Sequence, residues 1–291
     1  MIQTAIKHSF LEMLRCPVSG EPLHQEEDWL VSQSGQHRYR LNSEGIPLFA
    51  EQFISKEGRA QQEHYDKVAA AYLENLTYPH TQEYMAYLDR VFLDQVGNTP
   101  IGSVAEVCCG RGEAFLLIGD RVQTGVGIDV SVSMLRAARK TFADEKFFFA
   151  QGDATMMPIE DNQLDAVVML GGIHHVNDRE KLFNRIYRIL FPGGKFYWRE
   201  PVSELAASYG AAFVLLSIDL SSHLINTERP LVYEETVPPL EKAGFRVRIW
   251  QTYGFLGFCF FMNSDVLVFN RLFRYIRHYI RAITRFFYSS G

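Results

Sequence analysis

The stretch that decides the fold is Val104-Ala105-Glu106-Val107-Cys108-Cys109-Gly110-Arg111-Gly112. An apolar run that stops at two alternate glycines is typical of a buried strand that turns sharply into a helix. Backbone N–H groups are bare at such a turn, so they can face the polar part of a ligand. We therefore expect a small polar group to bind beside Gly110 and Gly112.

The sequence on either side of these glycines narrows the class of ligand. A dinucleotide-binding fold needs a third glycine three residues after Gly112, but position 115 is Phe, which disfavours NAD. A second strand-like run, 125–131, contains Asp129, roughly 20 residues further on, at the place where an acid hydrogen-bonds ribose hydroxyls. The pattern predicts a nucleoside ligand.

Two further strand-like runs, 147–150 and 166–170, also lead into loops of glycine and polar residues. Because the carboxyl ends of parallel strands meet at one edge of a sheet, the four loops predict one ligand-binding edge. We predict an α/β fold: a Rossmann-like, seven-stranded, mostly parallel sheet with helices on both faces. The remaining strands are expected at 195–200, 245–250 and 255–262, and helices at 180–190 and 234–243.

These residues resemble the class I S-adenosylmethionine-dependent methyltransferases, in particular the small-molecule branch that includes the quinone methyltransferases. The family's acid-x-Gly-x-Gly-x-Gly motif falls on Glu106, Cys108, Gly110 and Gly112, with Cys108 in place of the first glycine. Its other motifs are matched in order by 127–135, 152–158, 170–178 and 190–195. The resemblance implies S-adenosylmethionine (SAM) as the cofactor.

The resemblance also implies roles for single residues. Gly110 and Gly112 flank the methionine part of the cofactor, Asp129 holds the ribose, and Asp153 with the Ala154 backbone reads the adenine. The cofactor-binding residues expected on this basis are Tyr65, Glu106, Cys108, Gly110, Gly112, Asp129, Val130, Met134, Asp153, Ala154 and Leu170. Tyr65 and Tyr72 lie on a helical stripe at 61–72, which in the resembled family often caps the cofactor; plain helix packing is the alternative.

Methyl transfer from a sulfonium asks the protein mainly to position the nucleophile and, for a hydroxyl or amine, to remove a proton. His174 and His175 follow the fourth strand, near where the methyl group is expected to point, and histidine suits a base at neutral pH. Glu200, at the end of the fifth strand, is a further catalytic candidate. Capping of the loop is the alternative role of the two histidines.

Residues 1–50 are predicted to form a small module that resembles the zinc-ribbon-like leader of ribosomal-RNA guanine methyltransferases and of a small activator of tRNA methyltransferases. The expected Cys-Pro-x-Cys has become Cys16-Pro17-Val18-Ser19, and no second cysteine pair follows. Cys16, His24 and His37 would make a poor zinc site. We therefore expect a degenerate module without a metal, kept for packing or for covering the active site.

The charge of the chain is uneven. The net charge of −5 argues mildly against a nucleic-acid surface, but residues after 265 hold five arginines and no acid, so this tail is +5 and the rest −10. A basic amphipathic helix at 267–291 suits a membrane interface; docking on the acidic body and an oligomer contact are the alternatives. The oligomeric state stays open.

The four cysteines show no disulfide framework and the N-terminus shows no signal pattern, so a cytoplasmic protein is expected, with peripheral contact at the inner face of the membrane as the extension of the tail hypothesis. The predicted division is a leader at 1–50, a helical lid at 51–98, a SAM-binding domain at 99–265 and a C-terminal helix at 266–291. A long apolar insertion at about 203–224 indicates an apolar acceptor pocket or a partner surface.

The sequence predicts a SAM-dependent methyltransferase that acts on an oxygen or carbon of a hydrophobic small molecule, such as a lipid, quinone or natural-product intermediate. An RNA base methyltransferase is an alternative suggested by the leader alone. A non-catalytic SAM-binding scaffold is a second alternative, prompted by Cys108 and by the lack of an unambiguous base.

Overall fold

The computed structural model describes residues 5–200, 229 and 231–251. The predictions for 203–224, 255–262 and 266–291 fall outside these residues. The chain divides into two compact units. Met1–Asp66 with Asn98–Gln251 belong to the first, and the described part of the second is Lys67–Gly97.

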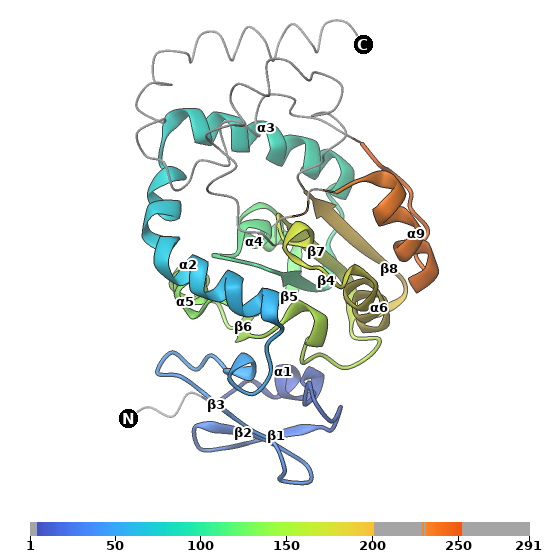
Figure 1. Cartoon of the computed structure of the whole chain (residues 1–291). Coiled ribbons are helices and arrows are strands. Elements are labelled where there is room, and N and C mark those ends of the chain that lie inside the picture. The colour runs from blue at the N-terminus through green and yellow to red at the C-terminus, as the bar shows by residue number, and fades with distance from the viewer. Residues whose placement is uncertain (1–4, 201–228, 230, 252–291) are drawn as a thin grey trace, which may run out of the picture. The chain divides into compact units, whose positions relative to one another are not determined.

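A parallel sheet of five strands forms the centre of the first unit (Figure 1). Its order is β6-β5-β4-β7-β8, so the strand order reverses between β4 and β7. The strands are β4 (Ile101–Val107), β5 (Val122–Asp129), β6 (Phe147–Gln151), β7 (Leu164–Leu170) and β8 (Leu190–Arg199). The predicted α/β architecture and its first five strands are thereby confirmed, and the carboxyl ends of these strands share one edge.

One face of the sheet packs against the helix that follows the glycine turn. Phe147 and Phe149 of β6 contact Phe115 of α4 (Glu113–Ile118), with ring centroids 5.0 and 6.2 Å apart. Gly125 and Gly127 of β5 leave room for these rings, since a Cβ atom there would lie 2.6 and 2.5 Å from them. The sequence therefore pairs bulky rings on β6 with glycines on its neighbour.

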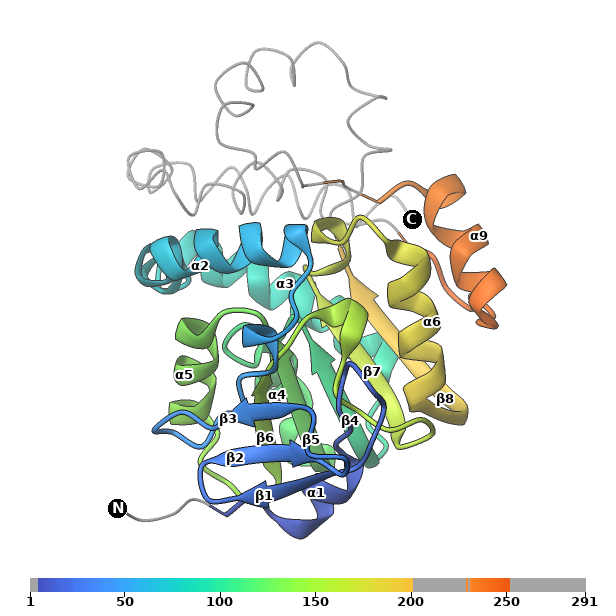
Figure 2. The same ribbon diagram turned by 60° about the horizontal axis from the view of Figure 1, so that its bottom comes forward.

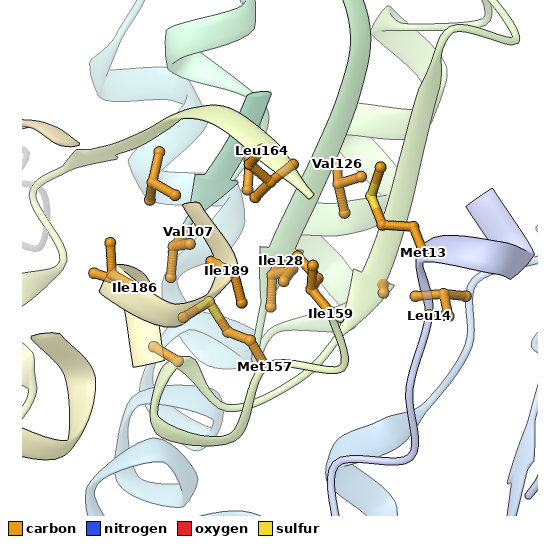
Figure 3. Close-up of a cluster of buried hydrophobic side chains, with 14 of the residues drawn as sticks. Met13, Leu14, Val107, Val126, Ile128, Met157, Ile159, Leu164, Ile186 and Ile189 are labelled. Carbon is orange, nitrogen blue, oxygen red and sulfur yellow. The ribbon is translucent and has the colours of Figure 1, made fainter. Parts of the chain in front are cut away.

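The other face is covered by the N-terminal segment and by α6 (Arg179–Ile189). Phe148 of β6 points this way and stacks on Phe10 of α1 (His8–Met13) at 5.1 Å. Met13 and Leu14 belong to the same buried cluster as side chains of β4, β5 and α6 (Figure 3). The N-terminal segment thus shares a hydrophobic core with the sheet.

The small antiparallel sheet of the N-terminal segment has the order β1-β2-β3 (Figure 2). Its strands are β1 (Leu23–Glu26), β2 (Trp29–Ser32) and β3 (Arg38–Arg40). The resemblance of 1–50 to a zinc ribbon is not supported. Cys16 lies 3.0 Å from the Tyr39 hydroxyl in a buried contact, while His24 pairs with Glu26 at the surface.

Among the residues that the structure describes, no group of three or more His, Cys, Asp or Glu side chains is placed to hold a metal ion. The module is instead held by apolar packing, for example of Tyr39 on Phe49 at 4.7 Å. Its cysteine is a buried, hydrogen-bonded side chain within that packing.

Two predicted helices are confirmed beside β8. They are α6 and α9 (Tyr233–Ala243), which lie side by side (Figure 2). The predicted strand at 245–250 is not confirmed: these residues pair with no strand within the described ranges, and the predicted strand 255–262 lies outside them. Phe245 and Trp250 pack their rings on Phe196 and Trp198 of β8, at 5.8 and 6.4 Å. This packing accounts for the apolar positions at the two ends of the stretch.

β8 begins five residues earlier than the predicted Lys195. Leu190 pairs with Leu164 and Lys195 pairs with Ala166, so the intervening residues bulge out of the ladder. Gly193 takes a φ of +85° in this bulge, which only glycine adopts without strain. The Pro-Gly-Gly sequence therefore marks a bulge inside the strand.

The predicted helix at 61–72 is part of α2 (Lys56–Asn75). The first half of α2 belongs to the first unit, and the rest, with Tyr72 and α3 (Pro79–Val96), belongs to the second. A hydrogen bond from the Thr81 hydroxyl to Asn75 Oδ1, 3.2 Å, joins the two helices across their short connection. No helix within the described ranges is both long and apolar enough to cross a membrane.

Candidate functional site

The turn after β4 takes left-handed backbone at three positions. The φ angles are +54° at Cys108, +52° at Gly110 and +88° at Gly112. Glycine adopts such angles without strain and a side chain does not, so Cys108 holds an unfavourable conformation. Its side chain fills the space beside the loop after β7, where a Cβ atom on Gly172 would lie 2.6 Å from the Cβ of Cys108.

Glu106 connects this turn to the helix that follows it. Its buried carboxylate accepts the N–H groups of Ala114 at 2.8 Å and Phe115 at 3.2 Å. These are donors of the first turn of α4, which have no partner inside the helix. Burial raises the pKa of Glu106 well above its usual value. The carboxylate that was expected to bind the cofactor thus fixes α4 to β4.

Asp129 stands at the end of β5 and reaches back to the glycine turn. Its Oδ2 accepts the Gly110 N–H and its Oδ1 accepts the Ser131 N–H, both at 2.8 Å. Burial raises the pKa of Asp129 to about 6, assisted by the charge of Glu113 and opposed by these backbone hydrogen bonds. Each oxygen keeps a second lone pair, which suits the two adjacent hydroxyls of a ribose.

Two other expected cofactor residues lie next to Asp129. Val130 uses its carbonyl to accept the side-chain amide of Gln151 at 3.0 Å. Met134 lies in the first turn of α5 (Val132–Thr141), and its terminal methyl group approaches Gly110: a Cβ atom on Gly110 would lie 3.3 Å from it. Both positions therefore border the glycine turn.

Asp153 has all four of its acceptor positions filled by residues of the chain. Oδ1 accepts the N–H and hydroxyl of Thr155 at 2.8 and 2.7 Å, and Oδ2 accepts the N–H and hydroxyl of Ser55 at 2.8 and 2.6 Å. Burial raises the pKa of Asp153, but the hydrogen bonds outweigh it, so the pKa is lowered overall. Asp153, which was predicted to bind the adenine, thus has one carboxylate oxygen occupied by Ser55. The N–H of Ala154 begins a short 3₁₀ helix, Ala154–Met156, and has no partner inside it.

The first half of α2 is fastened to three loops at the carboxyl edge of the sheet. Beyond Ser55, which also caps α2 through the Gly58 N–H at 3.0 Å, Asp66 accepts the Ser131 hydroxyl at 2.8 Å. Glu57 accepts the Asn177 side-chain amide at 2.9 Å, after β7. Sequence reasoning did not identify Ser55 or Asp66. A serine directly before a helix was the one available signal, because serine is a favoured N-cap.

The loop after β7 brings His174 and Glu200 together. Oε2 of Glu200 lies 2.7 Å from Nδ1 of His174, and Oε1 accepts the N–H groups of Gly172 and Ile173 at 2.7 and 2.8 Å. The Glu200 side chain is 1% exposed and that of His174 is 13% exposed. A carboxylate can only accept, so Nδ1 carries the proton and Nε2 is left to accept another. Leu170, the last residue of β7, pairs with Arg199 and so sets this loop beside Glu200.

His175 is enclosed by aromatic rings. Its ring centroid lies 3.8 Å from that of His174 and 6.2 Å from that of Tyr65, which meets it edge-on at 82°. Both ring nitrogens are buried and have no hydrogen-bond partner in the part of the chain that the structure describes. Burial lowers the pKa of His175 well below its usual value, and the neighbouring His174 and His64 lower it further. The three predicted catalytic residues and Tyr65 therefore form one cluster.

The geometry places loops from five strand ends around one edge of the sheet, at the point where the strand order reverses. Comparison with known proteins agrees with this arrangement. Residues 105–198 match the family model described as "Methyltransferase domain". This segment is therefore similar to methyltransferase domains. The matched residues run from β4 to β8 and contain the loops that follow β4, β5, β6 and β7, while Glu200 lies just beyond them.

Curated relatives of this domain are quinone methyltransferases. The demethylmenaquinone methyltransferase of Renibacterium salmoninarum is 34% identical over 106 residues, which are 36% of this chain and 44% of the relative. The 2-phytyl-1,4-naphtoquinone methyltransferase of Nostoc punctiforme is 32% identical over 106 residues, or 34% and 44% of the two chains. The matched stretch thus spans less than half the length of either relative.

Solved structures share the fold at lower identity. Phosphoethanolamine N-methyltransferase 2 of Haemonchus contortus, in complex with phosphomonomethylethanolamine and S-adenosylhomocysteine, superposes with a TM-score of 0.51. It is 21% identical, and the match covers 66% of this chain and 45% of that one. At this identity the likeness shows the fold of the domain.

Proposed function

We propose that this chain transfers the methyl group of SAM to a carbon or oxygen of a hydrophobic ring compound of the quinol class. The observation that carries the proposal is the match of 105–198 to a methyltransferase domain, whose curated relatives act on quinones by name. The paired His174 and Glu200 beside the glycine turn support it, because they supply a base where a hydroxyl of the acceptor would lie.

The residues at the carboxyl edge fit SAM. Asp129 presents both carboxylate oxygens for the ribose hydroxyls. The N–H groups of Gly110 and Gly112, which the sequence predicted to be bare, are bonded to Asp129 Oδ2 and to the Cys109 carbonyl, at 2.8 and 2.7 Å. Asp153 and the Ala154 N–H are proposed to read the adenine, once Ser55 yields an acceptor position on Asp153. When bound, SAM supplies a methyl group activated by the positive charge on its sulfur.

His174 is proposed as the general base. Glu200 holds the imidazole through Nδ1, so Nε2 can take the proton of an acceptor hydroxyl, and the carboxylate stabilises the imidazolium that results. With SAM bound, the electron pair left on the acceptor oxygen would form the new bond to the methyl group, or would be delocalised to a ring carbon that forms it, and S-adenosylhomocysteine would be released. A methylated ring carbon would then lose its hydrogen as a proton, which restores the aromatic ring. The same base therefore serves O- and C-methylation.

The first half of α2 is proposed to exclude water from the reacting groups. It is tied down through Ser55 and Asp66, and Tyr65 lies against His175. Closing such a site strengthens the electrostatic interactions inside it. Tyr65 is accordingly proposed to contact the cofactor on its outer side.

The test combines the full chain with SAM labelled on the methyl group and reduced 2-phytyl-1,4-naphthoquinone in detergent micelles. Label should pass to the organic extract, and His174→Gln should lower kcat roughly 10²- to 10⁴-fold with the SAM dissociation constant within about twofold. His24→Gln, at an exposed pair in the N-terminal sheet, is the matched control.

The other outcomes separate the alternatives. Label in RNA would favour an RNA base methyltransferase. SAM that binds but is never consumed with naphthoquinols, lipid extracts or RNA would favour a non-catalytic scaffold. If the wild-type chain does not bind SAM at all, both enzyme functions and the scaffold function are contradicted.

A hydrophobic acceptor also supports peripheral contact of a cytoplasmic protein with the inner face of the membrane through 267–291. Basic amphipathic segments bind anionic headgroups while their apolar face enters the acyl boundary. Co-sedimentation with anionic liposomes should therefore fall when 267–291 are deleted. Unchanged co-sedimentation would remove the membrane proposal.

A further inference from the structure

His175 has two polar atoms that no described residue satisfies. Nδ1 and Nε2 are both buried, and neither has a hydrogen-bond partner within the described ranges. Leaving a buried donor or acceptor unpaired costs about 1–3 kcal/mol, and native proteins rarely do so without a reason. His174, its neighbour, shows the contrast, because its Nδ1 is paired with Glu200 at 2.7 Å. Because no described residue pairs with these nitrogens, they are available to a bound group.

The position of His175 limits what that bound group can be. The residue lies in a single 3₁₀ turn, Ile173–His175, between the end of β7 and the start of α6. Its N–H bonds the Gly172 carbonyl at 3.2 Å, which keeps it beside the glycine that packs on Cys108. The ring touches His174 on one side and Tyr65 on another. A group that meets His175 is thus within reach of the proposed base.

The chemistry of the ring indicates which kind of group it takes. Burial with His174 and His64 nearby keeps the imidazole neutral, so it offers one N–H donor and one bare nitrogen. Because its pKa is lowered, His175 does not compete with His174 for the proton of the acceptor. Its N–H can instead donate a hydrogen bond to an oxygen. Such a bond becomes stronger as the oxygen gains negative charge.

We infer that His175 binds an oxygen on the ring of the acceptor and makes that oxygen a requirement for the substrate. The inference rests on the proposed function and deepens it. His174 removes the proton, and His175 holds an oxygen of the same substrate in place. A substrate that lacks this oxygen would leave the buried nitrogens of His175 unpaired. Sites built to hydrogen-bond a polar group of the substrate strongly reject analogues that lack it.

The competing explanation is that His175 only fills space between Tyr65 and His174. His175→Phe separates the two explanations, since it keeps a flat ring of similar size and removes both nitrogens. His175→Asn and His175→Gln refine the assignment, because an Asn amide lies near the place of Nδ1 and a Gln amide near that of Nε2. His24→Phe is the matched control, since it makes the same replacement at an exposed position in the N-terminal sheet.

The experiment measures kcat and KM of each full-length variant with reduced 2-phytyl-1,4-naphthoquinone, and SAM binding by calorimetry. We expect His175→Phe to lower kcat/KM for the naphthoquinol at least tenfold through KM, with the SAM dissociation constant within twofold. Either the Asn or the Gln variant should recover a substantial part of the loss. His24→Phe should leave the naphthoquinol KM within about twofold.

Any of three results would overturn the inference. One is a kcat/KM of His175→Phe within twofold of the wild type. Another is a parallel loss of SAM binding and melting temperature in all three variants, which would mark a packing role. Recovery by neither amide, with folding intact, would also contradict a hydrogen bond from this position.

Binding of the naphthoquinol to the protein loaded with S-adenosylhomocysteine is measured separately, by quenching of tryptophan fluorescence. If the wild type binds but transfers no methyl group, the proposed function fails, while tenfold weaker binding by His175→Phe still supports the role of His175. If the wild type transfers methyl groups and His175→Phe is unchanged, the role of His175 alone fails. If the wild type does not bind, both fail.

Discussion

Cys108 and Gly172 show how a substitution in a motif is accommodated by a residue far away in the sequence. The cysteine stands where the family has glycine, with a left-handed φ of +54°. The space for its side chain comes from Gly172, which lies in the loop after β7. The motif alone revealed the departure at Cys108, but the compensating glycine is 64 positions away and only the fold brings the two together.

Gly172→Ala should therefore destabilise the protein by about 1–3 kcal/mol, measured by urea unfolding. The backbone at Gly172 has a φ of −125°, which alanine adopts freely, but the added Cβ would lie 2.6 Å from Cys108 Cβ and 2.9 Å from Met169 Cε. The double variant Cys108→Gly with Gly172→Ala should recover much of the loss. Strict additivity of the two changes would contradict the steric pairing.

The raised pKa of Asp129 predicts how cofactor binding depends on pH. Its pKa of about 6 lies above the ordinary value, so the proton binds more tightly in the folded state. The contribution to folding is therefore complete below the ordinary pKa and is lost as the pH rises through about 6. Ribose hydroxyls need the carboxylate, so the effect on binding has the opposite sign: SAM affinity should fall as the pH falls.

Isothermal calorimetry at pH 7 and pH 5 measures this dependence. The SAM dissociation constant should rise about tenfold over the interval if only the ionised form binds. Asp129→Asn should bind more weakly at pH 7 and show little dependence on pH. A variant that keeps the full pH dependence would assign it to another group, such as the nearby Glu113.

At the scale of single elements, the sequence predicted helices and parallel strands well where periodic burial is unbroken. β4 to β7, α6 and α9 follow the expected ranges closely. The strand predicted at 245–250 stays a prediction, because alternation records which side chains are buried and does not record which backbone groups are paired. Phe245 and Trp250 are drawn to the aromatic side chains of β8 without forming a ladder with it.

Two of the three side-chain hydrogen bonds that fasten the first half of α2 can be removed together, and this predicts its local stability. Ser55 bonds Asp153 across 98 positions and Asp66 bonds Ser131 across 65, so neither was visible in the sequence. The variant Ser55→Ala with Asp66→Ala should speed hydrogen exchange at 56–66 while α6 keeps its protection. Equal exchange in both helices would contradict this local role.

At the scale of the whole molecule, the N-terminal segment is part of the core of the first unit. Leu14 is 1% exposed and its backbone bridges to Ile159, next to the sheet. The sequence indicated a module from its turn and strand signals but gave no sign of this joint core. A degenerate cysteine pattern says only that metal ligands are lost, not what replaces them.

Leu14→Ala should lower the free energy of unfolding by about 2–5 kcal/mol. Because the core is shared, the transition should stay single when followed by far-UV circular dichroism and by tryptophan fluorescence. Val18→Ala, at a position that is 49% exposed, should change stability by less than about 0.5 kcal/mol. Two separate transitions would show that the segment unfolds independently.

The Ser55 hydroxyl on Asp153 has a consequence for the rate at which the cofactor enters. If the adenine amino group takes that acceptor position, entry is an exchange of one donor for another, and the serine must leave first. The observed association rate would then level off at high SAM concentration, at the frequency with which the contact breaks. In Ser55→Ala, the association rate observed by stopped flow should keep rising linearly to higher SAM concentration. That result is expected if release of the Ser55 hydroxyl, 98 positions upstream of Asp153, limits the rate of cofactor entry.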